Sequence, residues 1–143
     1  MKYLFILLSL SFMACPKLKN DSISNQNNIQ GKWKWIESSF MTRGMSEPRI
    51  STPKIAGHTI ILEFKDATVD VYRNGKVMAS YQYEIKKMSP DNQLFLDLKI
   101  QNPNSLAEFE FRLSSGPCNF KNGMLEITGG YNDAGENQKY KRM

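Results

Sequence analysis

Apolar and polar residues alternate with a period of two along most of the chain from Gly31 onward, and this period is typical of β-strands. The dipeptide Asn74-Gly75 joins two such runs, Thr68–Arg73 and Lys76–Lys86, and is the strongest short signal for a β-hairpin. In the second run every other residue is apolar: Val77, Ala79, Tyr81, Tyr83 and Ile85. The pattern therefore predicts two antiparallel strands whose apolar residues share one face.

The same analysis predicts strands along the rest of the chain. Together they are Gly31–Phe40, Thr59–Phe64, Thr68–Arg73, Lys76–Lys86, Gln93–Gln101, Ala107–Leu113, Met124–Thr128 and Gln138–Arg142. The dipeptide Asn122-Gly123 directly precedes Met124–Thr128 and is a second good hairpin turn. No segment shows a convincing helical stripe, and the three residues after Tyr140 leave no room for a C-terminal helix. An antiparallel up-and-down sheet of eight strands can close on itself and so remove its exposed edges. We therefore predict an all-β, eight-stranded barrel over residues 31–143.

The segment Met41–Gly57 is the one long connection in this pattern, and glycines and prolines are spread through it. Connections of about seventeen residues in compact domains are often lids or binding loops, with disorder as the other option. Met41 and Met45 are flexible apolar side chains that can adapt to a ligand or to a protein partner. The barrel end that carries this segment is therefore the expected binding end.

The first fifteen residues have the features of an export signal. Lys2 precedes an apolar run that ends near Met13, which suits a signal peptide and is too short to span a bilayer. Ala14-Cys15 follows and resembles the lipobox of bacterial lipoproteins, whose cysteine is lipidated and becomes the first residue of the mature chain. The resemblance implies a signal peptide over residues 1–14 and a membrane anchor at Cys15 in a bacterial cell envelope, with the outer membrane favoured. An ordinary secretory signal with an incidental cysteine is the alternative.

Residues 15–30 are rich in Asn, Gln, Ser and Lys, with few apolar positions. Such a stretch cannot bury enough apolar surface to offset the entropy lost when it becomes ordered. We therefore expect a lipidated cysteine followed by a flexible tether, and we expect that tether to contribute nothing to folding.

Composition limits the available chemistry. One histidine and two cysteines cannot build a Cys/His zinc cluster or a multi-disulfide scaffold, so we expect no metal and no cofactor. If Cys15 carries lipid, Cys118 is expected to be a small apolar filler, and a Cys15–Cys118 disulfide is the competing idea. The net charge of +5 is spread along the chain and not gathered in blocks. It indicates a solvated basic surface, and nucleic acid is not an expected partner.

Groups suited to catalysis are scarce. His58 is the only imidazole that could activate a nucleophile, and the chain has no Gly-x-Ser-x-Gly motif. Glu108 and Glu110 share a strand face with Arg112, and that face has the character of a solvated surface. We therefore expect no catalytic residues and no enzyme activity.

A resemblance to a known family rests on an ordered set of short motifs. They are Gly31-Lys32-Trp33, Ile61-Leu62-Glu63-Phe64, Val71-Tyr72-Arg73-Asn74-Gly75-Lys76, Tyr81-x-Tyr83-x-Ile85, Met124-Leu125-Glu126-Ile127 and Tyr140-Lys141-Arg142. The first resembles the Gly-x-Trp signature of lipocalin and calycin barrels, and the whole order is similar to small lipocalin-like lipoproteins of Bacteroidetes. The resemblance implies that the first and last strands meet. It also implies that Gly31, Trp33, Tyr140 and Arg142 close the barrel, with Arg142 lying over the Trp33 indole.

Aromatic residues on the expected inner faces leave two functions open. They are Phe64, Tyr81, Tyr83, Phe109 and Phe111. In one interpretation these residues, with Met41 and Met45, bind a small hydrophobic ligand that the tyrosine hydroxyls orient. In the other they fill the core, and the protein is an interaction module, such as an envelope-associated inhibitor or accessory subunit. A cavity on the order of several hundred Å³ would favour the ligand, and a solid core with an exposed apolar patch near residues 41–57 would favour the module.

Overall fold

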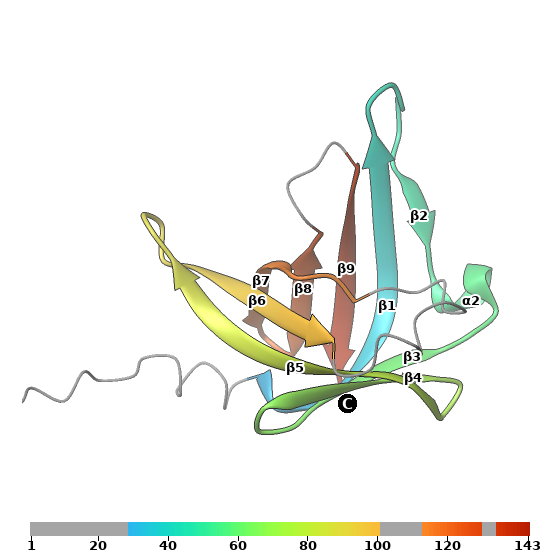
Figure 1. Cartoon of the computed structure of the whole chain (residues 1–143). Helices are drawn as coiled ribbons and strands as arrows, with labels where there is room; N and C mark the ends of the chain where they lie inside the picture. Colours follow the sequence, from blue (N-terminus) through green and yellow to red (C-terminus); the bar gives the residue numbers. More distant parts are fainter. Residues whose placement is uncertain (1–28, 101–112, 130–133) are drawn as a thin grey trace, which may run out of the picture.

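The computed structural model of the chain describes residues 29–100, 113–129 and 134–143. Its strands form one antiparallel sheet that closes into a barrel (Figure 1). The barrel strands are β1 (Gly31–Thr42), β3 (Ile60–Phe64), β4 (Thr68–Arg73), β5 (Lys76–Met88), β6 (Gln93–Ile100), β7 (Gly116–Lys121), β8 (Met124–Thr128) and β9 (Ala134–Arg142). Each pairs with the next, and β9 pairs back with β1. The predicted up-and-down eight-stranded barrel is confirmed, and the architecture is consistent with a lipocalin-like fold.

The barrel has two ends, which we call the base and the rim. The base is the end at which β1 begins and β9 ends, and the rim is the opposite end. Asn122-Gly123 turns the chain at the base and Asn74-Gly75 turns it at the rim. All four of these residues have positive φ, between 50° and 81°, as the tight turns of two-residue hairpins require. Both hairpins predicted from Asn-Gly dipeptides are therefore confirmed.

The barrel strand between β6 and β8 differs from the predicted one. The predicted strand Ala107–Leu113 lies outside the described residues except for Leu113, which is buried but not in a strand. The strand that pairs with β6 and β8 is β7, which the sequence pattern did not indicate. A side chain at Gly116 would place its Cβ 2.0 Å from the Thr128 carbonyl oxygen, so only glycine fits at the start of this strand.

The expectation of one long loop over Met41–Gly57 was wrong in its detail. Met41 belongs to β1, the short strand β2 (Arg49–Ser51) pairs with β1, and a single helical turn, α2 (Pro53–Ala56), follows. The Thr52 side chain accepts a hydrogen bond from the backbone N–H of Ile55 and caps the helix, while Gly57 ends it with a φ of 69°. The segment is therefore built of paired and capped backbone.

A β-bulge shifts the alternation in β5 relative to the predicted pattern. Val71 pairs with Ala79 and Tyr72 pairs with Val77, so Met78 is an extra residue in the ladder. The face that points inward therefore changes at Met78. Val77 is 50% exposed, although the sequence pattern placed it with the inward-facing residues.

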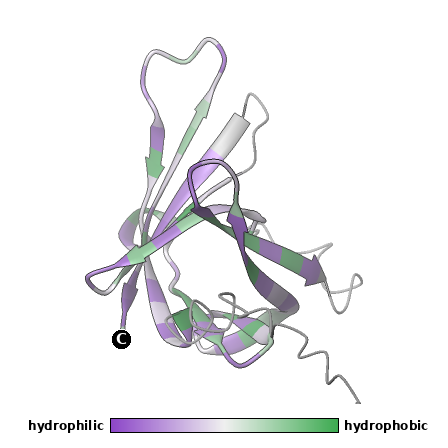
Figure 2. Ribbon diagram, turned by 90° about the vertical axis from the view of Figure 1, so that its left-hand side faces the viewer, coloured by the Kyte–Doolittle hydropathy of each residue, from purple (hydrophilic) through white to green (hydrophobic). Residues whose placement is uncertain are grey.

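The barrel interior is one continuous apolar core. It draws buried side chains from every barrel strand, and the alternation of hydrophobic and hydrophilic residues along the strands is visible in Figure 2. The largest fully buried side chains include Tyr140, Ile60, Leu62, Ile85 and Leu96. Because these residues come from opposite sides of the barrel, the core holds the closed sheet together from within.

The core also contains Ile29, which lies before the first strand and has no exposed surface. The neighbouring Gln30 donates a hydrogen bond to Asp66 at 3.1 Å. These two residues were expected to belong to the flexible tether, and that boundary was wrong: the folded domain begins by Ile29. The rest of the predicted tether lies outside the described residues.

Candidate functional site

The base is closed by contacts between the two ends of the barrel. Trp33 pairs with Arg142 across β1 and β9, and the Arg142 guanidinium lies 4.8 Å from the centre of the indole. The Trp33 Nε1 donates to the Ile29 carbonyl at 2.6 Å, and Arg142 donates to the Gln30 carbonyl at 2.8 Å. The predicted pairing of Arg142 with Trp33 is confirmed, and these two residues also fix the incoming chain to the base.

Tyr140 takes part in the β1–β9 closure that the resemblance implied, whereas Gly31 pairs with Phe64 of β3. Gly31 begins β1 with a φ of 109°, a conformation that other residues rarely adopt. Tyr140 pairs with Trp35 and is completely buried. Its hydroxyl donates to the Gln138 side chain at 2.9 Å, and burial, followed by the nearby Glu136 carboxylate, raises the pKa of Tyr140 well above its usual value.

The aromatic residues next to the base fill the barrel. The rings of Phe64 and Tyr83 meet edge to face with centres 5.0 Å apart, and the Tyr83 hydroxyl donates to the Lys65 carbonyl at 2.8 Å. Phe64, Tyr81 and Tyr83 are 2%, 3% and 5% exposed. A ligand cavity would leave the side chains that line it partly accessible, so these three residues serve as packed core.

The barrel interior on the rim side of Trp33 contains polar side chains that form hydrogen bonds within the protein. Trp35 donates from Nε1 to the Ser38 hydroxyl at 3.0 Å, and Ser38 and Gln138 are 3% and 2% exposed. Across the described residues, no buried side-chain nitrogen or oxygen lacks a hydrogen-bond partner. The burial of Ser38 was not predicted, because a bulge between Trp35 and Glu37 changes which residues of β1 point inward.

His58 is held near the rim in a structural setting. Its ring stacks on Trp35 at 6.0 Å between centres, and its Nδ1 lies 3.0 Å from the Ala56 carbonyl and 3.3 Å from the Arg73 guanidinium. None of these partners is a nucleophile that an imidazole base could activate. Among the described residues, no three His, Cys, Asp or Glu side chains lie close enough to hold a metal ion.

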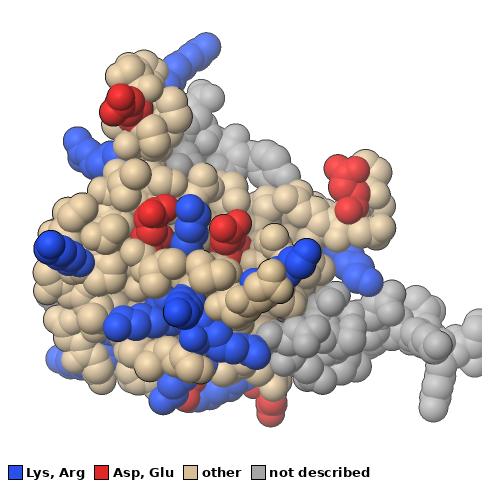
Figure 3. Space-filling view, turned by 180° about the vertical axis from the view of Figure 1, so that it is seen from behind, with Lys and Arg blue, Asp and Glu red and all other residues tan. Residues whose placement is uncertain are grey.

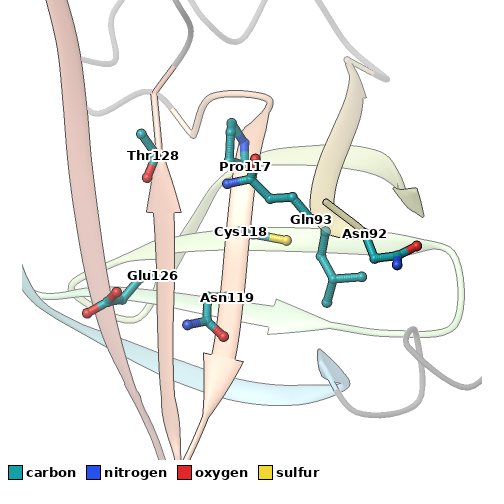
Figure 4. Close-up of a pocket in the computed structure, with 8 residues that line it drawn as sticks. Asn92, Gln93, Pro117, Cys118, Asn119, Glu126 and Thr128 are labelled. Carbon is teal, nitrogen blue, oxygen red and sulfur yellow. The ribbon is translucent and has the colours of Figure 1, made fainter. Parts of the chain in front are cut away.

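Cys118 lines a hollow of about 350 Å³ between β6, β7 and β8 (Figure 4). Around it stand polar side chains, among them Gln93, Asn119 and Glu126. Burial raises the pKa of the Cys118 thiol to about 12. A thiol with that pKa is protonated at neutral pH and is a poor nucleophile, so the described structure supports the role of a small apolar filler.

The outer face of β3, β4 and β5 carries a network of charged and polar groups. Asp70 accepts hydrogen bonds from Lys65 at 2.6 Å and Ser80 at 2.5 Å. Burial alone would raise the pKa of Asp70, but these hydrogen bonds lower it below its usual value. Tyr72 donates to Glu63 at 2.6 Å and lowers the pKa of Glu63. Each carboxylate in this network accepts a hydrogen bond from a neighbouring side chain, so the face has the features of an ordinary solvated surface.

At the rim, two paired strand segments and α2 carry exposed apolar residues that belong to the predicted binding segment. We call residues 38–51 the rim ribbon, in which β1 pairs with β2 from Ser38 to Phe40. Ile50 lies opposite Ser39, two residues from Met41, so Met41 and Ile50 share the outer face of the ribbon. Both are 49% exposed, and Ile55 in the adjoining α2 is 69% exposed.

The predicted ligand residues do not form one site. Phe64, Tyr81 and Tyr83 are buried in the core, whereas Met41 and the half-buried Met45 lie in the rim ribbon. The remaining predicted ligand residues, Phe109 and Phe111, lie outside the described residues, as does Cys15. The structure therefore separates the predicted lining into a core set and a surface set.

Comparisons with known proteins identify no relative: no family model, no curated protein and no solved structure matches the chain. Among the described residues, no helix is long and apolar enough to cross a membrane. The class of protein is thus defined by the fold alone, a closed antiparallel β-barrel with a projecting ribbon.

Proposed function

We propose that this protein is a lipid-anchored component of a bacterial cell envelope that binds another envelope protein through its rim ribbon. The observation that carries the proposal is the contrast between a packed core and exposed apolar residues at the rim. The polar groups that would orient a small ligand, such as the Tyr83 hydroxyl, are bonded to the protein itself. By contrast, Met41, Ile50 and Ile55 present apolar surface to solvent near one end of the molecule.

An extended segment of the partner is the occupant that best suits the ribbon. β2 is the terminal strand in the order of the sheet and is paired with β1 alone among the described strands. An unpaired strand edge can accept a further strand from another chain. The exposed residues in and next to β2 along the chain include Arg43, Arg49 and Lys54, with Glu47 as the acidic residue among them, so an acidic segment is favoured.

Site-specific photo-crosslinking in the native cells tests the partner. A photoreactive residue at Ile50 should give a discrete crosslinked product, and Arg49→Glu should abolish it. Met88 is the matched control, because it is 46% exposed and lies at the end of β5, a strand that pairs with neither β1 nor β2. Equal products from positions 50 and 88, or no product from position 50, would contradict the proposal.

The anchor is tested separately. Cys15→Ser should remove the lipid and release the protein from the membrane fraction, whereas wild-type protein should carry the added mass of acyl chains such as palmitate. Wild-type protein without lipid mass, together with a variant that still sediments with membranes, would contradict the anchoring proposal.

A further inference from the structure

The outer surface of the barrel near the base carries a row of three lysines. The strand register places Lys34 of β1 opposite Lys141 of β9, Lys141 opposite Met124 of β8, and Met124 opposite Lys121 of β7. All three lysines are exposed. Residues directly opposite in neighbouring antiparallel strands point to the same face, so the lysines form one band across four strands. We call Lys34, Lys121 and Lys141 the base row.

The next row towards the rim is built differently. There Lys139 binds Glu37 at 3.0 Å and lies opposite Glu126, so its charge is balanced on both sides. Figure 3 shows this face, with a basic side chain between two acidic ones and a group of basic side chains below them. The base row has no such partners, since none of its lysines forms an ion pair among the described residues. Like charges placed opposite each other destabilise a sheet, so the base row does not serve the stability of the barrel.

Other basic groups lie next to the base row. Arg142 neighbours Lys141 in sequence and lines a hollow of about 310 Å³ together with Lys121 and the turn residues Asn122 and Gly123. Lys32 lies two residues before Lys34 and binds Glu63 at 3.6 Å. The base row is thus the part of a larger basic surface in which the lysine charges form no ion pair among the described residues.

The chain enters the barrel at the same end. Ile29 and Gln30 are fixed to the base through Trp33 and Arg142. From Cys15 to Ile29 the chain spans at most about 50 Å when fully extended. A lipid at Cys15 would therefore keep the base, and with it the base row, within about 50 Å of the membrane surface.

We propose that the base row docks the barrel onto an anionic membrane surface by binding lipid headgroup phosphates. The proposal deepens the proposed envelope location and rests on it, because the tether is what holds the base near the bilayer. Each lysine close to such a surface adds about a fivefold increase in binding. Docking at the base leaves the rim ribbon pointing away from the membrane and accessible to a partner.

Vesicle sedimentation with the full chain carrying Cys15→Ser tests this docking without the lipid anchor. Binding to neutral phosphatidylcholine vesicles measures the apolar contribution of the signal peptide, residues 1–14. The additional binding to vesicles with about 30% phosphatidylglycerol is the charge-dependent part of the vesicle binding. Lys34→Gln/Lys121→Gln/Lys141→Gln should reduce that part on the order of a hundredfold, and Lys141→Gln alone about fivefold. The charge-dependent part should also fall steeply between about 0.05 M and 0.5 M salt.

The matched control removes three exposed lysines elsewhere, with Lys76→Gln/Lys87→Gln/Lys99→Gln. They lie in β5 and β6, outside the base row and the rim ribbon, and this variant should keep the binding of the parent chain. Equal losses in both triple variants, or no preference of the parent chain for anionic vesicles, would overturn the proposal. A soluble anion competing as well as the vesicles would also overturn it, because the row would then be a phosphate site. Anchoring at Cys15 is judged independently, from the lipid mass of wild-type protein.

Discussion

The base and the rim of the barrel share strands, but large side chains pack against one another at the base and are exposed to solvent at the rim. At the base, Trp33, Arg142 and Ile29 join the first strand, the last strand and the incoming chain in one set of contacts. At the rim, β1 continues past the barrel and pairs with β2, and large apolar side chains such as Ile50 are turned to solvent. The difference indicates that the closing contacts are concentrated at the base, and it supports the proposal that a partner binds at the rim.

Truncating the indole at the base should have the largest effect. Trp33→Ala should lower the free energy of unfolding by about 3–5 kcal/mol, because it removes a ring that is 2% exposed. Arg142→Ala removes a cation–π contact and should cost about 0.5–2 kcal/mol. Urea unfolding followed by circular dichroism measures both. Equal losses in the two variants would mean that the indole packing is not what closes the base.

Removing Ile29 should have the next largest effect. Ile29→Ala should lower the free energy of unfolding by about 2–5 kcal/mol, as expected for a fully buried aliphatic residue. Gln30→Ala is the control and should change it by less than about 1 kcal/mol, because its side-chain hydrogen bond is exposed. If Ile29→Ala proved as mild as the control, residues 29 and 30 would belong to the tether after all.

Alkaline pH should lower the free energy of unfolding through groups that are buried in the core, and not through the exposed residues of the rim. Burial raises the pKa of the Cys118 thiol from about 9 to about 12, and of the Tyr83 hydroxyl from about 10 to about 12. A group with a raised pKa in the folded state favours folding below its unfolded pKa and loses that contribution as pH rises towards the folded value. The free energy of unfolding should therefore fall between about pH 9 and pH 12.

Cys118→Ala shows whether the thiol is responsible. This variant should lose less stability than wild type between about pH 9 and pH 11, when each chain is compared with itself at pH 7 by urea unfolding. An identical pH profile for the two chains would mean that the thiol ionises as freely in the folded state as in the unfolded state.

The smallest effect on stability is expected at the rim. Met41→Ser/Ile50→Ser/Ile55→Ser should change the free energy of unfolding by less than about 0.5 kcal/mol per site, since these side chains are half or more exposed. The same variant should lose the crosslinked partner. Val77→Ser/Met88→Ser removes comparably exposed apolar surface elsewhere and should keep it. A large loss of stability in the rim variant would show that the ribbon packs on the barrel.

Much of the fold could be predicted from the sequence because local signals agreed with the tertiary structure. The two Asn-Gly turns and the alternation in β4, β5 and β6 identified hairpins directly. The pairing of Trp33 with Arg142 followed from the resemblance, not from the pattern. In the hairpins the deciding residues lie within two consecutive strands.

The features that escaped prediction depend on contacts distant in sequence. Gly116 starts β7 because the Thr128 backbone approaches it closely, and no local pattern marks that approach. Bulges in β1 and β5 reverse the inward face by inserting one residue, which brought Ser38 into the core and Val77 to the surface. Ile29 lies in a polar stretch, and its side chain is buried in a core whose other members come from strands distant in sequence.

The candidate site was predicted less well than the fold, because the sequence identifies apolar faces without showing whether they enclose space. Tyr83 and Met41 were both suitable for a ligand lining, yet one bonds to the Lys65 carbonyl and the other is exposed on the rim ribbon. The location of a binding end at residues 41–57 agrees with the position of the exposed apolar surface. Its chemistry could be inferred only after β2 was seen to pair with β1.

Native mass spectrometry of the protein purified from its own cell envelope distinguishes a packed barrel from a barrel that holds a ligand, because only the second carries the added mass of a small molecule. We expect the mass of the lipidated chain with no small molecule held inside, alone or in complex with a protein partner that the Arg49→Glu variant fails to retain. One small hydrophobic molecule per chain, retained by both wild type and Arg49→Glu, would contradict it and would show that the barrel interior is a binding site.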